Sequence, residues 1–256
     1  MKEFLESVGM GARRVVEVSG QMAIMLTQAL MWLFAPPLKW RNIIKQFDFV
    51  GVQSLFVVVL TGTFTGMVLA LQSYTALKRF GAESMVAPAV ALSMARELGP
   101  VLTGLMVAGR AGSAMATELG TMRVTEQIDA LTTMAVNPVR YLVTPRILAG
   151  IVMLPILDII ASFVGIVGGY IVGVKMLGIN SGVYIARTVD FLTFGDIMDG
   201  IVKAGVFGLI LALVACYNGF YTTGGAEGVG KAATRSVVTG CVLILASDYV
   251  MTSFMY

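Results

Sequence analysis

The sequence predicts an all-α integral membrane protein with five membrane-spanning helices, formed by a single domain that covers residues 1–256. Hydrophobic residues make up 57% of the chain and charged residues only 13%, against roughly 25% charged in ordinary soluble domains. Several apolar runs reach about 20 residues, the length that one helix needs to cross a bilayer. The 29 glycines agree with this class, because small residues let membrane helices pack closely.

The first 46 residues predict an elbow helix that lies on the membrane surface, or re-enters it, before the first span. The apolar stretch from Met22 to Phe34 is too short to cross a bilayer, and Pro36-Pro37 closes it. No small-residue cleavage site follows, which argues against a signal peptide. Trp32 and Trp40 suit the depth of the lipid headgroups.

The spans themselves follow the apolar runs. We expect them at residues 49–71, 88–108, 147–174, 197–217 and 237–256. In the first, Gly62 and Gly66 have a small-xxx-small spacing, which favours ordinary helix packing over a dimer contact, and Gly165, Gly169 and Gly173 form a second tight face in the third. Lys and Arg residues near the span ends are more numerous on the side of the N-terminus. We therefore expect a cytoplasmic N-terminus and a C-terminus on the outer side.

A ridge of small residues continues from the second span. Five of them recur every four residues and form one smooth helix face, against which another backbone can approach closely: Gly104, Ala108, Gly112, Ala116 and Gly120. Glu97 lies seven residues before Gly104, almost in line with this face. Its carboxylate should therefore point toward protein or an internal cavity and away from lipid.

The segment 121–135 predicts a short amphipathic helix outside the membrane, because it is too short and too charged to span. Its charged residues and the one just before it are Glu118, Arg123, Glu126 and Asp129, and its apolar residues include Ile128, Leu131 and Met134. A solvated helix face is the ordinary interpretation of such charges. The apolar residues would nevertheless be left exposed unless something covers them, which favours a partner protein.

The residue inventory excludes several kinds of chemistry. The glycine-rich stretch Gly224–Lys231 ends in Lys-Ala and follows no strand, so it is not a phosphate-binding loop, and the chain cannot hydrolyse ATP alone. The chain has no His, and Cys216 and Cys241 sit in apolar runs, so neither a Ser/His/Asp set, a metal cluster nor a disulfide framework is supported. Nothing points to a nucleic-acid partner.

Charged residues inside the spans are the main candidates for function. They are Arg96, Glu97, Lys203 and Asp248. Arg96 and Glu97 are adjacent, so on a helix they face different directions and need partners elsewhere. A charge at the bilayer centre costs at least about 2.5 to 3.5 kcal/mol, so these groups need mutual pairing or a wet cavity. One interpretation is a polar centre that opens and closes as the helices move, or that contacts a lipid headgroup. The other is a set of static salt bridges, including an i,i+4 pair between Asp199 and Lys203.

Two further acids in or beside the spans suggest structural roles. Asp196 begins the fourth span, where a carboxylate caps a helix N-terminus. Asp158, three residues after Pro155, suggests a helix kink or an interfacial position.

The sequence resembles the MlaE-like (Mla/YrbE-type) permease family, the membrane subunits of ABC transporters that work with MCE proteins. The similarity covers most of the chain and is weakest before about Phe47. The matching motifs are RELGP at 96–100, AGRAGSA at 108–114, E-x-G-x-M-R-x-T-E-Q at 118–127, AVNP, and TPR at 144–146.

This resemblance implies a homodimeric permease in a bacterial inner membrane, with its C-terminus in the periplasm. A pair of ATPase subunits would bind ATP and Mg, and this chain would hold no cofactor. The other partners would be an MCE-domain protein on the periplasmic side and possibly a STAS-type accessory subunit. The implied activity is phospholipid transport between the inner membrane and the periplasmic carrier, which maintains the lipid asymmetry of the outer membrane.

The resemblance also implies residue roles. The positions of Arg96, Glu97, Asp196, Lys203 and Asp248 belong to the interior near the substrate cavity, and Leu69 and Leu77 would line a lipid pocket at the dimer interface. The segment 121–135 would be a coupling helix seated in a groove of the ATPase. Two alternatives remain: the same machine carrying sterol or other hydrophobic cargo, and a lipid-modifying membrane enzyme, for which the chain offers no nucleophile or metal set.

Overall fold

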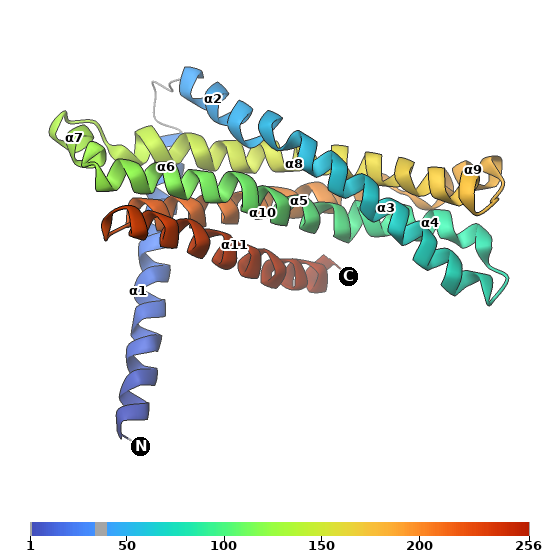
Figure 1. Ribbon diagram of the computed structural model, residues 1–256, viewed down its shortest axis with the longest axis horizontal. Coiled ribbons are helices and arrows are strands. Elements are labelled where there is room, and N and C mark those ends of the chain that lie inside the picture. Colours follow the sequence, from blue (N-terminus) through green and yellow to red (C-terminus); the bar gives the residue numbers. More distant parts are fainter. Residues whose placement is uncertain (1, 34–39, 256) are drawn as a thin grey trace.

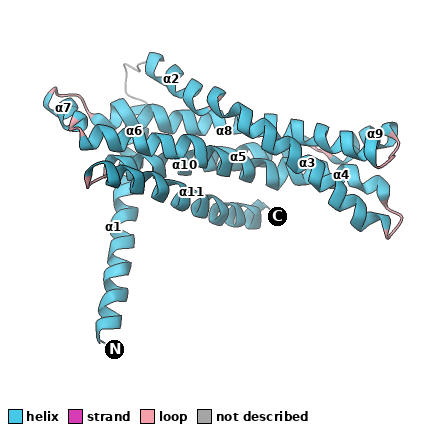
Figure 2. Ribbon diagram, viewed as in Figure 1, coloured by secondary structure: helices cyan, strands magenta, loops and turns pink. Residues whose placement is uncertain are grey.

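The computed structural model describes residues 2–33 and 40–255, and within these residues the chain forms helices, turns and loops but no strand (Figure 2). The prolines Pro36 and Pro37, which were expected to close the elbow, lie outside the described residues. The α-helices are α1 Lys2–Leu33, α2 Trp40–Val50, α3 Leu55–Lys78, α4 Val86–Ser93, α5 Gly99–Val107, α6 Ser113–Val124, α7 Gln127–Thr133, α8 Thr144–Tyr170, α9 Ser181–Phe191, α10 Phe194–Phe220 and α11 Gly225–Met255.

Shorter helical segments join several of these helices end to end. Two are 3₁₀ turns, η1 Val52–Ser54 and η2 Glu83–Met85. Four are π-helical turns, in which the helix widens to hold one extra residue: η3 Met94–Leu98, η4 Ala108–Gly112, η5 Val139–Val143 and η6 Ile171–Met176. The helices joined in this way form long continuous helical segments, which are called rods below.

Among the described residues, five rods are long and apolar enough to cross a membrane, which confirms the number of spans expected from the sequence. They are Trp40–Lys78, Glu83–Val124, Val139–Met176, Phe194–Phe220 and Gly225–Met255. The rods are longer than most of the apolar runs within them. The second has 42 residues, or about 63 Å at 1.5 Å per residue, whereas a hydrocarbon core is about 30 Å thick. Hydropathy marks only the apolar part of a helix, and the backbone hydrogen bonds continue past it.

The predicted helix over 121–135 is wrong in its bounds. Residues up to Val124 belong to α6, the chain turns at Thr125 and Glu126, and α7 covers only Gln127–Thr133. Glu126 has a φ of 59°, in the left-handed region, which ends the long helix. The physical reason for the turn is burial, because it lets Ile128 reach the core of the protein.

The rods run side by side, with loops gathered at two ends (Figure 1). The α7 turn and the turn between α10 and α11 lie at one end, and α9 and the turn between α3 and α4 lie at the other. Arg123 lies in the last turn of α6 and Lys231 in the first turns of α11, so these two basic residues share the α7 end. Lys78 at the end of α3 belongs to the opposite end.

Helix α1 runs across the direction of the other long helices (Figure 1). It is 32 residues long, so it extends well beyond the apolar stretch that suggested an elbow. Met25 and Ala29 are buried and pack with Leu142 and Ile147 near the α7 end. An interfacial position for α1 stays a prediction. A helix that runs across the spanning helices has the direction expected of a helix lying along the membrane surface.

Glycines bring the first and third rods together. A Cβ added to Gly62 would lie 2.8 Å from the carbonyl oxygen of Ala161, and one added to Gly66 would collide with the carbonyl of Gly165. The small-xxx-small pair of the first span thus packs within the chain, as expected. Large side chains such as Phe56, Phe64 and Phe163 are exposed on the outside of the bundle, the pattern of a lipid-facing surface.

The small-residue ridge of the second rod is buried over its whole length. Close backbone approach occurs at Ala116, because a Cβ on Gly219 would lie 2.8 Å from its carbonyl oxygen. The three glycines of the ridge face side chains: Gly104 faces Ile244 and Phe207, Gly112 faces Leu211, and Gly120 faces Thr222. The predicted backbone contact is therefore correct at one point and wrong at Gly104, Gly112 and Gly120.

Candidate functional site

A π-helical turn in the middle of the second rod organises the polar residues. At η3 the N–H of Gly99 donates to the carbonyl of Met94, five residues earlier. Pro100 has no N–H, so it cannot donate to the carbonyl of Arg96 as an α-helix would require. That carbonyl instead accepts a hydrogen bond from Nζ of Lys203, at 3.2 Å. The proline of the RELGP motif thus leaves the carbonyl of Arg96 available to accept a hydrogen bond from a side chain of α10.

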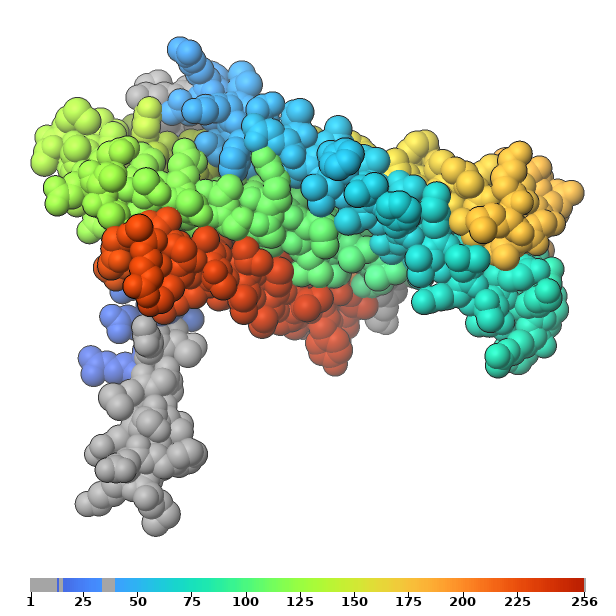
Figure 3. Space-filling model, viewed as in Figure 1, coloured from blue at the N-terminus to red at the C-terminus, as the bar shows by residue number. Residues whose placement is uncertain are grey.

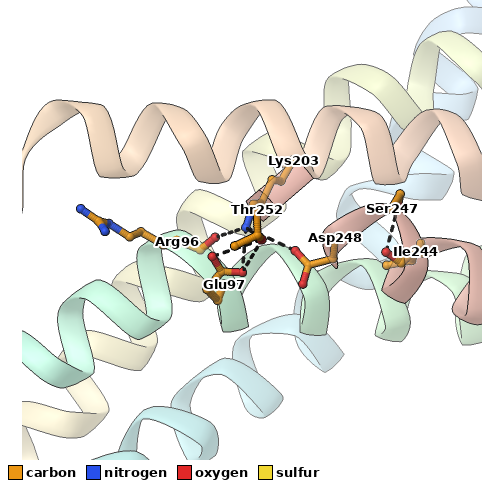
Figure 4. A network of polar contacts seen from close by, with 7 residues as sticks. All are labelled: Arg96, Glu97, Lys203, Ile244, Ser247, Asp248 and Thr252. Carbon is orange, nitrogen blue, oxygen red and sulfur yellow. Dashed lines mark hydrogen bonds and ion pairs between the residues drawn. The ribbon is translucent and has the colours of Figure 1, made fainter. Parts of the chain in front are cut away.

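Lys203 is the centre of a polar network that joins three spanning rods (Figure 4). Its ammonium lies 2.7 Å from Oε2 of Glu97 on the second rod. From α11 it contacts the hydroxyl of Thr252 at 2.7 Å and Oδ1 of Asp248 at 3.3 Å. The hydroxyl of Thr252 also lies 3.2 Å from Glu97. One cation therefore ties together the second, fourth and fifth spans.

Burial is uneven across this network. The side chain of Lys203 is 0% exposed, whereas that of Glu97 is 36% exposed and that of Asp248 20% exposed. A buried ammonium needs compensating anions, and the two carboxylates supply them. Their partial exposure leaves one side of the network open at the surface of this single chain.

Arg96 has a different partner, although it precedes Glu97 directly. Its Nε lies 2.6 Å from Oδ1 of Asp196, the acid near the start of α10, and its Nη2 also contacts that oxygen. Asp196 and Thr193 form a capping box at this helix start, which confirms the expected capping role. The expectation that adjacent Arg96 and Glu97 would seek partners elsewhere is confirmed, and both partners belong to α10. The simple Asp199–Lys203 pair does not account for Lys203, whose ammonium reaches the two other rods.

Asp158 corrects a sequence-based interpretation. It is 3% exposed and lies inside the bundle, not at a membrane interface. An added Cβ at Gly99 would come 2.7 Å from its Oδ1, and one at Gly200 would come 3.3 Å from its Oδ2. Asp158 therefore sits between the second, third and fourth rods, behind the π-turn that carries Arg96 and Glu97. Its nearness to Pro155 in the sequence concealed this placement.

Leu69 and Leu77 lie on the side of α3 that faces α4. Both are half-buried and pack in an apolar cluster with Val86 and Val90. A neighbouring open hollow of about 460 Å³ is lined by Leu71, Gln72, Thr75, Ala76 and Arg79. The lipid pocket expected at a dimer interface stays a prediction, and this hollow adds residues that the sequence did not single out.

At the α7 end, Glu118 pairs with Arg146, whose side chain is 3% exposed. The Nη2 of Arg146 lies 2.6 Å from Oε2 of Glu118, and its Nη1 donates to the carbonyl of Leu142. These contacts tie the second rod to the third. Arg123 and Asp129 form an exposed pair at 2.6 Å across the α6–α7 turn.

The apolar residues of this end are placed differently from expectation. Ile128 is 2% exposed and packs with Leu142 and Val143, so this chain itself covers it. Leu131 is partly buried against the same cluster, and Met134 is exposed. The α7 turn forms a protruding end of the molecule (Figure 3), and Glu126 and Asp129 are exposed there.

Arg110 is a residue that the sequence analysis missed. It lies in η4, and its guanidinium contacts the carbonyl of Phe49, the hydroxyl of Ser54 at 3.1 Å and the side chain of Gln53. It also stacks 5.0 Å from the ring centre of Phe49. Its place in the AGRAGSA motif was a signal, because an Arg inside an apolar helix needs acceptors.

The part of the chain that the structure describes contains no cluster of three or more His, Cys, Asp or Glu side chains suited to bind a metal ion. Cys216 is a buried free thiol and Cys241 a half-buried one.

Comparison with known proteins gives a consistent result. A family model described as "Permease MlaE" matches residues 43–254. A probable ABC transporter permease protein of Rickettsia bellii is 48% identical over 250 residues, which cover 98% of this chain and 96% of the relative. The intermembrane phospholipid transport system permease protein MlaE of Haemophilus influenzae is 38% identical, over 99% of this chain and 97% of the relative. The chloroplastic protein TRIGALACTOSYLDIACYLGLYCEROL 1 of Arabidopsis thaliana is 37% identical, over 91% and 67%.

Proposed function

This chain belongs to the MlaE permease family, and from that premise we propose that it is the membrane subunit of an ATP-driven transporter that moves phospholipid between a bacterial inner membrane and a periplasmic MCE partner. The name of the Haemophilus relative supports phospholipid as cargo, and that of the Rickettsia relative supports an ABC-type machine. The chain lacks a phosphate-binding loop, so a pair of ATPase subunits would bind ATP and Mg and hydrolyse the nucleotide.

The observation that supports this proposal most is the continuity of the second rod. Residues Glu83–Val124 form one helical rod, with the α7 turn at one end and the π-turn of Arg96 and Glu97 in its interior. A push on α7 by a closing ATPase would therefore move this rod as a unit. The Lys203 network contacts this rod at the π-turn, so it would move with the rod.

The chemistry of the polar centre suits an amphiphilic cargo. Arg96 is partly exposed beside the network, and guanidinium groups bind phosphate through parallel hydrogen bonds. Movement of the second rod against α10 would separate Glu97 from Lys203, and a lipid headgroup would then compete for the freed cations. Return of the rod would restore the ion pair and expel the headgroup.

The proposed assembly places the partners at opposite ends of the bundle. The α7 end, with the basic residues near the span ends, would face the cytoplasm and the ATPase, by the positive-inside rule. The α9 end would face the periplasm and the MCE protein. Two copies of this chain would form the dimer, with Leu69 and Leu77 near the lipid pocket between them, and a STAS-type subunit would be an accessory.

Co-purification tests the assembly. The tagged full-length chain would be isolated from native membranes in mild detergent, and its proteins and lipids identified by mass spectrometry. We expect an ATPase, an MCE-domain protein and phospholipid. Sterol or another hydrophobic molecule in place of phospholipid would favour the alternative cargo, and absence of any ATPase would contradict the transporter.

Reconstitution tests the activity. The purified complex in proteoliposomes would receive a fluorescent phospholipid, with ATP and Mg or without them. We expect transfer that requires both, and that fails when the ATPase subunit carries an inactivating change in its phosphate-binding loop. Transfer independent of ATP would contradict the proposal.

A further inference from the structure

Asp158 and Ser162 form a polar pair inside the bundle for which the transport mechanism above has no use. They lie one turn apart on α8, and the hydroxyl of Ser162 lies 3.4 Å from Oδ1 of Asp158. The same hydroxyl lies 3.0 Å from the carbonyl oxygen of Met94, the first residue of the π-turn. The pair therefore connects the third rod to the backbone that carries Arg96 and Glu97.

The proton count at Ser162 is informative. A serine hydroxyl has one hydrogen to donate and two lone pairs to accept with. The Met94 carbonyl can only accept, and an ionised Asp158 could only accept too, so Ser162 could not fully satisfy both. If Asp158 carries a proton, its O–H donates to Ser162, and Ser162 donates to Met94. Each oxygen contact then becomes a hydrogen bond.

The surroundings of Asp158 favour the same form. Asp158 is 3% exposed, and among the described residues no Lys or Arg nitrogen lies within 4.0 Å of its carboxylate. The elements packed against it bring Met94, Gly99 and Gly200, while Lys203, one turn further along α10, directs its ammonium to Glu97 and Asp248. An unpaired carboxylate in such a place is costly, whereas a neutral acid that is hydrogen-bonded costs much less.

We propose that Asp158, as a neutral carboxylic acid, is a positioning residue that holds the π-turn of the second span through Ser162. The π-turn is then fixed from two sides. Lys203 of α10 binds the carbonyl of Arg96, and the Asp158–Ser162 pair of α8 binds the carbonyl of Met94. Both carbonyls belong to the turn that orients Arg96 and Glu97. This role in transport rests on the proposed function, but the hydrogen-bonded arrangement does not.

Four variants of the full-length chain separate this role from others. Asp158→Asn keeps the size and a donor without charge, and Asp158→Leu removes the donor. Ser162→Thr keeps the hydroxyl, and Ser162→Val removes it. We expect near wild-type transport for the Asn and Thr variants, and a loss of about tenfold for the Leu and Val variants, the order expected when a buried hydrogen-bonding group loses its partner.

Two readouts do not depend on transport. The infrared spectrum at neutral pH should show the carbonyl stretch of a protonated acid that disappears in Asp158→Asn and persists in Asp248→Asn. Hydrogen exchange of the peptide containing residues 94–100 should rise in Asp158→Leu and Ser162→Val only. These readouts test the arrangement even if the complex moves a different cargo.

The outcomes divide clearly. An infrared band unchanged by Asp158→Asn would overturn the proposal, and so would an Asn variant as defective as the Leu variant, which would show a need for the anion. Wild-type transport and exchange in all four variants would also overturn it. If Asp158→Leu does not assemble, the comparison of Ser162→Val with Ser162→Thr decides.

Discussion

The ammonium nitrogen of Lys203 lies 2.7 Å from a carboxylate oxygen of Glu97, although the two residues are 106 positions apart in the chain. This ion pair joins the fourth span to the π-turn of the second, and Asp248 adds the fifth. Because Lys203 is fully buried and its anions are partly exposed, moving the helices or offering the cation another anion would break the pair. Its geometry thus suits a site whose state changes during transport.

The Lys203 network predicts the effect of removing either partner. Glu97→Ala and Lys203→Ala should each lower the rate of lipid transfer by at least about tenfold, a factor equivalent to ~1.4 kcal/mol. Loss of Glu97 leaves a buried ammonium with fewer anions, and loss of Lys203 leaves two acids without their shared cation. Transfer in proteoliposomes measures this effect, and size-exclusion chromatography checks that the complex still assembles.

A matched control is Lys231→Ala. Lys231 pairs with Glu227 at 2.6 Å, but both side chains are exposed and one helical turn apart. Such pairs contribute little, so transfer should not change. Wild-type transfer in both Glu97→Ala and Lys203→Ala would instead mean that the bridges are static and play no part in transport.

The α6–α7 turn predicts a coupling defect. Glu126→Lys reverses an exposed charge at the proposed ATPase contact, so ATP hydrolysis should continue while lipid transfer falls. Glu126 has a φ of 59°, which Asn adopts more easily than most residues. Glu126→Asn therefore keeps the turn and removes the charge without reversing it, and its defect should be smaller. ATPase and transfer rates are measured on the same preparation. Unchanged transfer in the Lys variant would count against a coupling role for this residue.

The glycine contacts predict a ranking of stability. Gly66→Ala should destabilise the protein by about 1–3 kcal/mol, because its Cβ would meet the backbone of Gly165 and the helices would have to separate. Gly112→Ala should cost less, because its Cβ would lie 3.3 Å from the end of the Leu211 side chain, which can move. Gly112→Leu is too large for that adjustment and should disrupt packing. Thermal unfolding in detergent gives the ranking.

Gly109→Ala serves as the control for this series. A Cβ there meets nothing within 4 Å, so its stability should be equal to that of the wild type or higher. Normal assembly and stability of Gly112→Leu would refute the close packing of the ridge at that point.

The Glu118–Arg146 pair predicts a stability effect at the α7 end. Arg146→Met should lower the unfolding temperature clearly, since it removes contacts to Glu118 and to the carbonyl of Leu142. Arg146→Lys should restore only part of the loss, because an ammonium lacks the two-sided geometry of a guanidinium. Arg123→Met is the comparison, because its pair with Asp129 is exposed. Equal effects of Arg146→Met and Arg123→Met would show that burial of Arg146 does not matter.

Much of the molecule could be predicted from local sequence. Span number followed from apolar runs, and the need of Arg96 and Glu97 for distant partners followed from their adjacency inside a span. The bounds of the rods could not be found this way, because hydropathy falls before the helix ends. Asp158 was misinterpreted because its nearness to Pro155 looked like a local feature, and Arg110 was not singled out. Both residues lie against helices that are far away in the sequence.

The sequence by itself determined that the chain is a helical membrane protein, that its buried charges must be paired, and that it carries no phosphate-binding loop of the G-x-x-x-x-G-K-[ST] type. These conclusions depend only on transfer free energies and on residue types that are present or absent. The tertiary structure decided which charges meet, Lys203 with Glu97 and Asp248 and Arg96 with Asp196, and it brought the hydroxyl of Ser162 to the carbonyl of Met94. It also decided that Ile128 is covered by its own chain. The physical reason is that ion pairs and packing act over a few ångströms, between residues whose separation in the sequence carries no information about their distance in space.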